Sequence, residues 1–109
     1  MPAPERLTSS GNTYIAHDFD VFPIDANFHP IAAVYVVTRR TGQRGAAEHE
    51  VLFVGETAKL QERFADHPKA ECFARHEAGC IGVHRQEDEK ARRETVSDLV
   101  AELKPPCND

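Results

Sequence analysis

Two side chains that can bind a phosphate group, Arg63 and His67, stand four residues apart in the middle of the chain. Residues at this spacing lie on the same side of an α-helix, and a fixed pair of cationic groups can hold phosphoryl oxygens by charge-assisted hydrogen bonds. Taken alone, an arginine and a histidine on a solvated helix flank are the commoner explanation. The pair therefore indicates a phosphate site only if neighbouring elements bring further polar groups to it.

A second set of residues has the chemistry of a metal site. Cysteine and histidine are the preferred ligands of zinc, and four of them can close a tetrahedral structural site. They recur here at intervals of four: Cys72, His76, Cys80 and His84. The spacing differs from paired Cys-x-x-Cys ligands, and the helix expected here ends near Gly79, so the four do not share one helix face. Small buried cysteines are the commoner explanation, and a zinc-stabilised binding module is kept as an alternative.

The segment that contains the arginine and histidine reads as strand, turn and helix. Residues 51–54 are β-branched and aromatic, which predicts a strand, and Gly55 is expected to end it where the backbone turns sharply. Thr57 is a candidate N-cap for the helix that follows. Leu60 and Phe64 lie one helical turn apart, so we expect both to be buried.

Strands and helices are predicted on both sides of this segment. Residues 31–38 are almost continuously apolar, which indicates a central strand, and the polar residues 39–49 predict a long hairpin loop into the next strand. Downstream, residues 69–78 predict a short helix, with Gly79 in the left-handed position after its end. Residues 80–84 then predict a third strand.

The last predicted helix spans residues 87–103, and its register decides which side chains face the sheet. At about 100° per residue, its apolar side chains gather on one face. That face carries Val96, Leu99, Val100 and Leu103. Arg92 falls beside Leu99 on this inner face, where it can border a cleft, whereas Glu94 points to nearly the opposite side and is expected to face solvent.

All 109 residues are expected to form one domain, in which residues 1–30 are an N-terminal extension of a core at 31–108. Residues 1–13 are rich in Pro, Ser, Thr and Gly and predict a flexible leader. Residues 14–24 alternate loosely between apolar and polar types. Pro23 is expected to restrict any strand there to an edge of the sheet.

Four short motifs, in order along the chain, resemble the GIY-YIG nuclease superfamily. They are AVY at 33–35, FVG at 53–55, LQERFADH at 60–67 and DLVAELKPPCN at 98–108. The likeness covers about residues 31–108. It implies an α/β (α+β) domain with a small three-stranded antiparallel sheet flanked by helices, in the order β-β-α-α-β-α. The elements predicted above have the same order.

The resemblance also implies functional positions. Tyr35, Arg63, His67 and Asn108 match the catalytic tyrosine, arginine, histidine and terminal asparagine, and Gly55 matches the motif glycine that lies against the substrate. A tyrosine can take the proton of the attacking water only if nearby positive charge favours the phenolate. An arginine and a metal ion stabilise the charge that builds on the phosphoryl oxygens and the leaving group.

Two positions depart from the family pattern. Phe53 stands where the second tyrosine belongs and has no hydroxyl to exchange a proton. Val96 stands at the position of the glutamate that holds one divalent metal, and valine cannot bind a metal. Glu94 is close in sequence but turned away, and Glu56 is another acid that could substitute.

The function implied is therefore a degenerate endonuclease domain, weak or inactive, that binds nucleic acid or a protein partner. The alternative is an active DNA endonuclease that hydrolyses phosphodiester bonds through Tyr35 and Arg63 with magnesium or manganese. Arg39, Arg40 and Lys59 are candidate contacts to the substrate, and Arg44 lies in the same loop as the first two. A polar hairpin loop is nevertheless more often simply solvated.

Composition narrows the class of protein further. The formal net charge is −5, which argues against a strong non-specific DNA binder, although a local basic face is compatible with it. No apolar run reaches membrane-spanning length and the first residues lack a signal-peptide pattern, so we expect a cytoplasmic chain without membrane contact. Three cysteines are an odd number and do not indicate a secreted disulfide framework.

Overall fold

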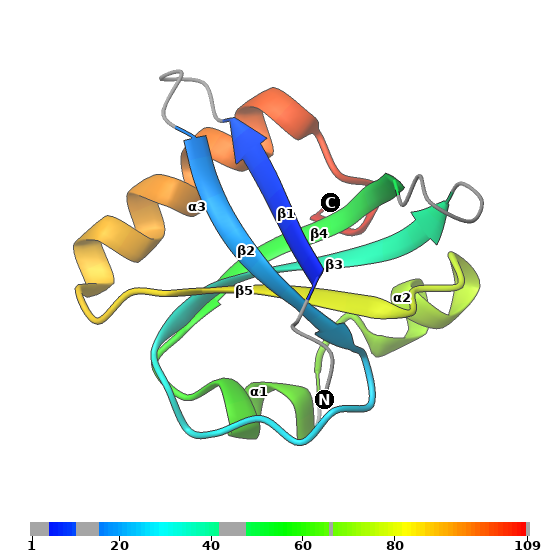
Figure 1. Ribbon diagram of the computed structural model, residues 1–109, viewed down its shortest axis with the longest axis horizontal. Coiled ribbons are helices and arrows are strands. Elements are labelled where there is room, and N and C mark those ends of the chain that lie inside the picture. The colour runs from blue at the N-terminus through cyan, green and yellow to red at the C-terminus, as the bar shows by residue number, and fades with distance from the viewer. Residues whose placement is uncertain (1–4, 11–15, 42–47, 66, 109) are drawn as a thin grey trace.

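The computed structural model describes residues 5–10, 16–41, 48–65 and 67–108, with side chains over 19–39, 50–65 and 67–108. Five strands form one antiparallel sheet in the order β1-β2-β5-β3-β4 (Figure 1). The strands are β1 Glu5–Ser10, β2 Ala16–Pro23, β3 Ala33–Thr41, β4 Glu48–Thr57 and β5 Cys80–Arg85. The helices are α1 Leu60–Ala65, α2 Ala70–Arg75, α3 Glu89–Leu103 and the short 3-10 helix η1 Pro106–Asn108.

Helices cover both faces of the sheet. Side chains alternate along a strand, so β3 sends Tyr35 and Val37 to one apolar cluster and Val34 and Val36 to the other. The first cluster is completed by three residues from α1, α2 and η1, namely Leu60, Phe73 and Cys107. The second is completed by Leu99 of α3. Because β3 is buried on both faces and paired on both edges, the prediction of a central strand there is confirmed.

The prediction of a three-stranded sheet is wrong in strand number, since the N-terminal residues add two strands. Residues 5–10 form β1 instead of a flexible leader, and 1–4 and 11–13 lie outside the described residues. β2 is not an edge strand, because it pairs with β1 on one side and β5 on the other. Pro23 is tolerated because it ends the strand beyond Val21, the last residue of β2 that pairs with β1.

The helices begin and end differently from the sequence-based expectation. α1 ends at Ala65, so His67 lies after the helix and not one turn along it from the arginine. The left-handed residue after α2 is Glu77, with φ of 58°, and not Gly79. β4 also continues through Gly55 to Thr57, so this glycine does not end the strand.

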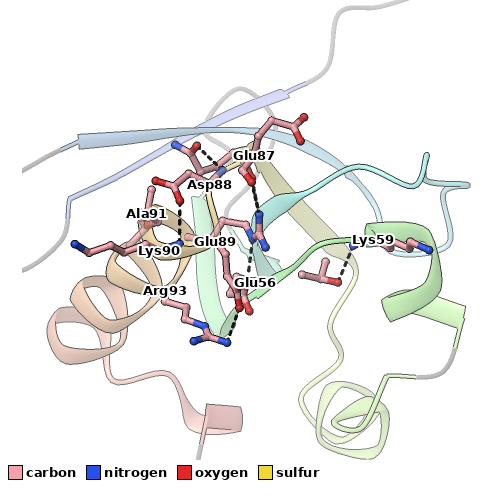
Figure 2. Close-up of polar contacts among 12 residues, drawn as sticks. Glu56, Lys59, Glu87, Asp88, Glu89, Lys90, Ala91 and Arg93 are labelled. Carbon is pink, nitrogen blue, oxygen red and sulfur yellow. Dashed lines mark hydrogen bonds and ion pairs between the residues drawn. The ribbon is translucent and has the colours of Figure 1, made fainter.

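The register predicted for the last helix is confirmed except at its end, where Leu103 is 37% exposed and not on the buried face. Arg92 and Leu99 are its buried residues, whereas the side chain of Glu94 is 68% exposed. The helix starts at Glu89 because the Asp88 carboxylate accepts a hydrogen bond from the Lys90 N–H at 3.2 Å (Figure 2).

A disulfide joins Cys72 in α2 to Cys107 in η1 across a sequence separation of 35 residues. The odd number of cysteines gave no indication of this bridge. Three cysteines can form one bridge and leave one cysteine outside it, and only proximity in the folded chain identifies the partners. Among the described helices none is long and apolar enough to cross a membrane.

Candidate functional site

A cleft of about 600 Å³ lies along β4, the edge strand at one side of the sheet. Its walls come from strands β3 and β4 and from helices α1 and α3. The strands contribute Tyr35, Phe53, Gly55 and Glu56, α1 contributes Arg63, and α3 contributes a stripe that includes Val96. The structure thus brings together most of the positions that the family resemblance singles out.

The polar centre of this site is a hydrogen bond of 2.7 Å between Tyr35 Oη and His67 Nε2. The Lys69 N–H donates to His67 Nδ1 at 3.0 Å, so Nδ1 is an acceptor. A neutral imidazole carries one proton, which must then be on Nε2. His67 therefore donates to the tyrosine oxygen, and the phenolic proton of Tyr35 remains available to another acceptor.

Burial sets the protonation states of both groups. Burial, helped by the positive charges of Arg63 and Lys69, lowers the pKa of His67 to about 4. His67 is consequently neutral at pH 7, so the expected cationic pair of arginine and histidine does not exist. Burial also raises the pKa of Tyr35 well above its usual range, against the opposing effect of the Arg63 charge, while Glu56 adds to the rise. The phenol is therefore protonated.

Gly55 is required by a close approach between strands. It pairs with Tyr35 across the β3–β4 ladder, and a Cβ atom at Gly55 would lie 2.6 Å from Tyr35 Oη and 2.7 Å from Phe53 Cε1. The Phe53 and Tyr35 rings stack with centroids 5.9 Å apart. Only 1% of Tyr35 is exposed, so the phenol lies beneath the cleft surface and only glycine leaves room above it.

Arg63 is the cation of α1 that faces the cleft. It lines both this cleft and an adjoining cavity of about 410 Å³ that also includes Lys59. Its guanidinium makes no ion pair or hydrogen bond with any residue the structure describes. Among the described residues, nothing occupies this guanidinium, so an anionic ligand can reach it.

Glu56 faces α3 and is engaged there by an arginine. Arg92 Nε donates to Glu56 Oε1 at 2.8 Å, and the two side chains are 5% and 25% exposed respectively. Arg92 Nη1 also donates to the carbonyl oxygens of Gln86 and Glu87. Figure 2 shows Glu56 pointing from β4 toward the first turn of α3. The sequence placed Arg92 on the inner face, but its carboxylate partner could not be read from the helix alone.

The resemblance expects a metal-binding glutamate at position 96, but the valine there cannot bind a metal. Val96 lines the cleft, next to Val100 on the same helix. Glu94 instead forms an exposed contact of 4.0 Å with Lys90. Glu94 is therefore not placed to substitute for the missing glutamate, and Glu56 is the one carboxylate that reaches the cleft from the described residues.

Asn108 holds the free edge of β4. Its Oδ1 accepts from the Val54 N–H at 2.8 Å and its Nδ2 donates to the Val54 carbonyl at 2.9 Å. An amide side chain thereby replaces the neighbouring strand that an edge residue lacks. Both amide atoms are committed to the backbone, so this residue positions β4 beside the cleft.

The other predicted contacts lie apart from the cleft. Arg39 makes an exposed ion pair with Glu77 at 3.7 Å. The Lys59 ammonium lies 3.8 Å from Glu62 Oε1 and reaches only the adjoining cavity. Arg44 and the side chain of Arg40 fall outside the described residues.

The four-ligand zinc arrangement is not assembled. The His84 ring lies against Phe19 in a tilted contact, with ring centroids 5.8 Å apart, and Phe19 belongs to the cluster under α3. Cys80 and His84 are four residues apart in β5, so their side chains point to the same face of the sheet. Cys72 packs on the cluster at the opposite face. The residue that joins Cys72 and His76 in space is Cys107.

Three residues of α3 that flank its apolar face also belong to the cleft, although their place was not predicted from the sequence. Arg93, Ser97 and Ala101 line the cleft at intervals of four. This spacing places them in one row beside Val96 and Val100. Extending the predicted inner face by one row of side chains would have identified them.

Comparisons with known proteins were made against family models, curated proteins and solved structures, and none of the three produced a match.

Proposed function

We propose that this chain is a GIY-YIG-like domain that binds the phosphate backbone of nucleic acid in the cleft beside β4 and cleaves it weakly or not at all. The observation that carries the proposal is the charge of the cleft. Its carboxylate, Glu56, is neutralised by Arg92, whereas Arg63 keeps its charge without a partner in the described part of the chain. A cleft with surplus positive charge attracts phosphoryl oxygens.

The arrangement of elements supports the family part of the proposal. From β3 onward the chain runs strand, strand, helix, helix, strand, helix. Tyr35, Gly55 and Arg63 come from three of these elements and converge on one cleft. Their sequence spacing alone does not require this convergence.

Three features argue against efficient hydrolysis. Val96 offers no metal ligand and Phe53 offers no hydroxyl, so both a charge-stabilising ion and a proton-transfer group are missing. Tyr35 is protonated and buried, and a phenol that keeps its proton cannot act as a general base. Loss of a general base alone typically costs about 10² to 10⁴ in rate.

Binding is tested by fluorescence anisotropy with labelled single- and double-stranded DNA and RNA at low and moderate salt. We expect affinity to fall with salt, and Arg63→Ala to weaken binding about tenfold, because one charge-assisted contact is lost. Arg75→Ala is the matched control, since it removes one exposed positive charge from α2, outside the cleft. Equal effects of the two variants, or no binding at all, contradict the proposal.

Cleavage is tested in magnesium and in manganese with the natural chain and with the double variant Phe53→Tyr, Val96→Glu. We expect cleavage only from the double variant, because it supplies both missing groups. Robust cleavage by the natural chain, abolished by Glu56→Gln, identifies the alternative, an active enzyme in which Glu56 holds the metal. Glu94→Gln is the control carboxylate, exposed on the same helix as Val96.

A further inference from the structure

A cluster of three metal-ligating side chains lies between α2 and η1. The sulfurs of Cys72 and Cys107 and a ring nitrogen of His76 all lie within 4.8 Å of one another. We propose that these three residues bind one zinc ion when the disulfide between the two cysteines is reduced. The set shares two members with the arrangement expected from sequence spacing, and it replaces Cys80 and His84 by one residue from the end of the chain.

The two ligands from α2 are aligned by helix geometry. The His76 N–H donates to the Cys72 carbonyl at 3.1 Å, which is one turn of helix. His76 is the C-cap of α2, so the two side chains leave the same side of the helix. The third ligand arrives from η1, with Cα atoms of Cys72 and Cys107 5.9 Å apart. The fold thus brings all three residues together in the disulfide form.

The donor set suits zinc. Zinc binds thiolate sulfur at about 2.3 Å and imidazole nitrogen at about 2.0 Å in a tetrahedron, so two sulfurs that share one ion lie about 3.8 Å apart. In the disulfide form the three ligand atoms already lie within 4.8 Å of one another, and on reduction the two sulfurs have to move apart to share an ion. Cys107 is 1% exposed, while Cys72 and His76 are half-buried. The fourth position therefore opens toward solvent on the α2 side, where water can complete the tetrahedron.

The disulfide and the zinc site exclude each other, because the same two sulfurs make both. Starting from the zinc form, one protein thiolate attacks a low-molecular-weight disulfide, forms a mixed disulfide and releases one small thiolate. The second protein thiolate attacks the protein sulfur of the mixed disulfide. This step forms the Cys72–Cys107 bond and releases the second small thiolate. Two electrons pass from the protein sulfurs to the small disulfide, and zinc leaves as Zn²⁺ with its oxidation state unchanged.

Both states have the same structural consequence for the cleft. Each one ties η1 to α2, and Asn108, next to Cys107, hydrogen-bonds the edge of β4. In a reducing compartment, where disulfides are rare, zinc replaces the covalent link. The edge strand of the cleft therefore stays anchored under either redox condition.

The test begins with the full chain reduced by a phosphine, which is then removed without oxygen, and titrated with zinc against a chromogenic chelator. We expect one zinc per reduced chain and at least about hundredfold weaker binding by the disulfide form. Cobalt should give the intense visible absorption of a tetrahedral thiolate site in the reduced chain alone. Circular dichroism of each sample establishes that the chain is folded.

Variants assign the ligands. We expect His76→Ala and Cys107→Ser to lower zinc affinity at least about tenfold, and Cys80→Ser and His84→Ala to leave it unchanged. If Cys107→Ser fails to fold, His76→Ala decides the matter, because it leaves both cysteines in place. Three outcomes overturn the proposal: a folded, reduced chain that binds no zinc, equal binding by the disulfide form, and loss of zinc in the Cys80 or His84 variants.

Discussion

The two flanks of β4, one facing α1 and α2 and the other facing α3, differ in the charge of their polar groups. Toward α1 and α2, a neutral tyrosine and a neutral histidine share one buried hydrogen bond. Toward α3, the Glu56 carboxylate and the Arg92 guanidinium form an ion pair, so their charges compensate each other and do not attract a ligand. Arg63, which lines the cleft from α1, supplies the charge that neither flank offers.

The difference means that the two flanks depend on different interactions. The neutral flank is held by packing, since Tyr35 and His67 lie among the rings of Phe53, Phe64 and Phe73. These contacts stabilise the fold whether or not a reaction takes place. The α3 flank needs a free carboxylate for metal chemistry, and here an arginine occupies the one that is present. Four changes of stability test this contrast.

The largest effect is expected on the charged flank. Arg92→Ala leaves a partly buried carboxylate without its partner, and breaking such a pair should lower the free energy of unfolding by about 3 kcal/mol. Arg93→Ala is the control on the same helix, because its pair with Glu89 is mostly exposed and should contribute less than about 0.5 kcal/mol. Urea unfolding of both variants measures the difference. Equal losses would mean that burial of the Glu56 pair does not matter.

The neutral flank should respond to pH instead. Because the folded pKa of His67 is about 4, below the unfolded value of about 6.5, the unfolded chain binds the extra proton between these values. The contribution of His67 to the free energy of unfolding is complete above pH 6.5. It decreases by about 2 to 3 kcal/mol as the pH falls to 4. Unfolding measured from pH 7.5 to 4, relative to His67→Gln, isolates this term from carboxylate titration. Parallel curves for the two proteins would contradict the assignment.

The close approach beneath the cleft should produce a smaller effect. Gly55→Ala places a methyl group against the Tyr35 hydroxyl and the Phe53 ring, and such overpacking should cost about 2 kcal/mol. Gly79→Ala is the matched control, since a Cβ there meets nothing within 4 Å, and its effect should stay within about 0.5 kcal/mol. Thermal unfolding of the two variants compares them. A neutral Gly55→Ala would show that the two rings can move aside.

The smallest effect is expected at the edge that joins the two flanks. Asn108→Ala removes two hydrogen bonds to Val54 and should cost about 1 kcal/mol, because water can replace them at an edge. Amide hydrogen exchange of Val54 is the more direct measurement and should accelerate in the variant. The neighbouring Gly55 amide is a useful internal reference, since β4 pairs with β3 there. Unchanged exchange at Val54 would exclude the anchoring role of Asn108.

Local patterns in the sequence were sufficient for several features. The apolar period of the last helix placed Arg92 and Leu99 inward and Glu94 outward, as the structure has them. The continuous apolar run before residue 39 identified the strand buried on both faces. These features depend on residues a few positions apart, and helix and strand geometry converts such spacing directly into a direction in space.

Other features depended on contacts between distant segments. Glycine at position 55 suggested a turn, yet it serves the approach of Tyr35 from a neighbouring strand. The charge of His67 followed from its burial, and burial is a property of the packed molecule. The same holds for the ion pair of Arg92 with Glu56, which are 36 residues apart.

The sequence by itself therefore determined the α/β class, the central strand and the face of the last helix, because these follow from short-range periodicity. Tertiary structure alone decided that five strands pair, that Cys107 and not Cys80 meets Cys72, and that the arginine of α3 takes up the carboxylate beside the cleft. Each of these depends on which segments become neighbours when the chain collapses, and sequence spacing carries no distance between segments that are far apart.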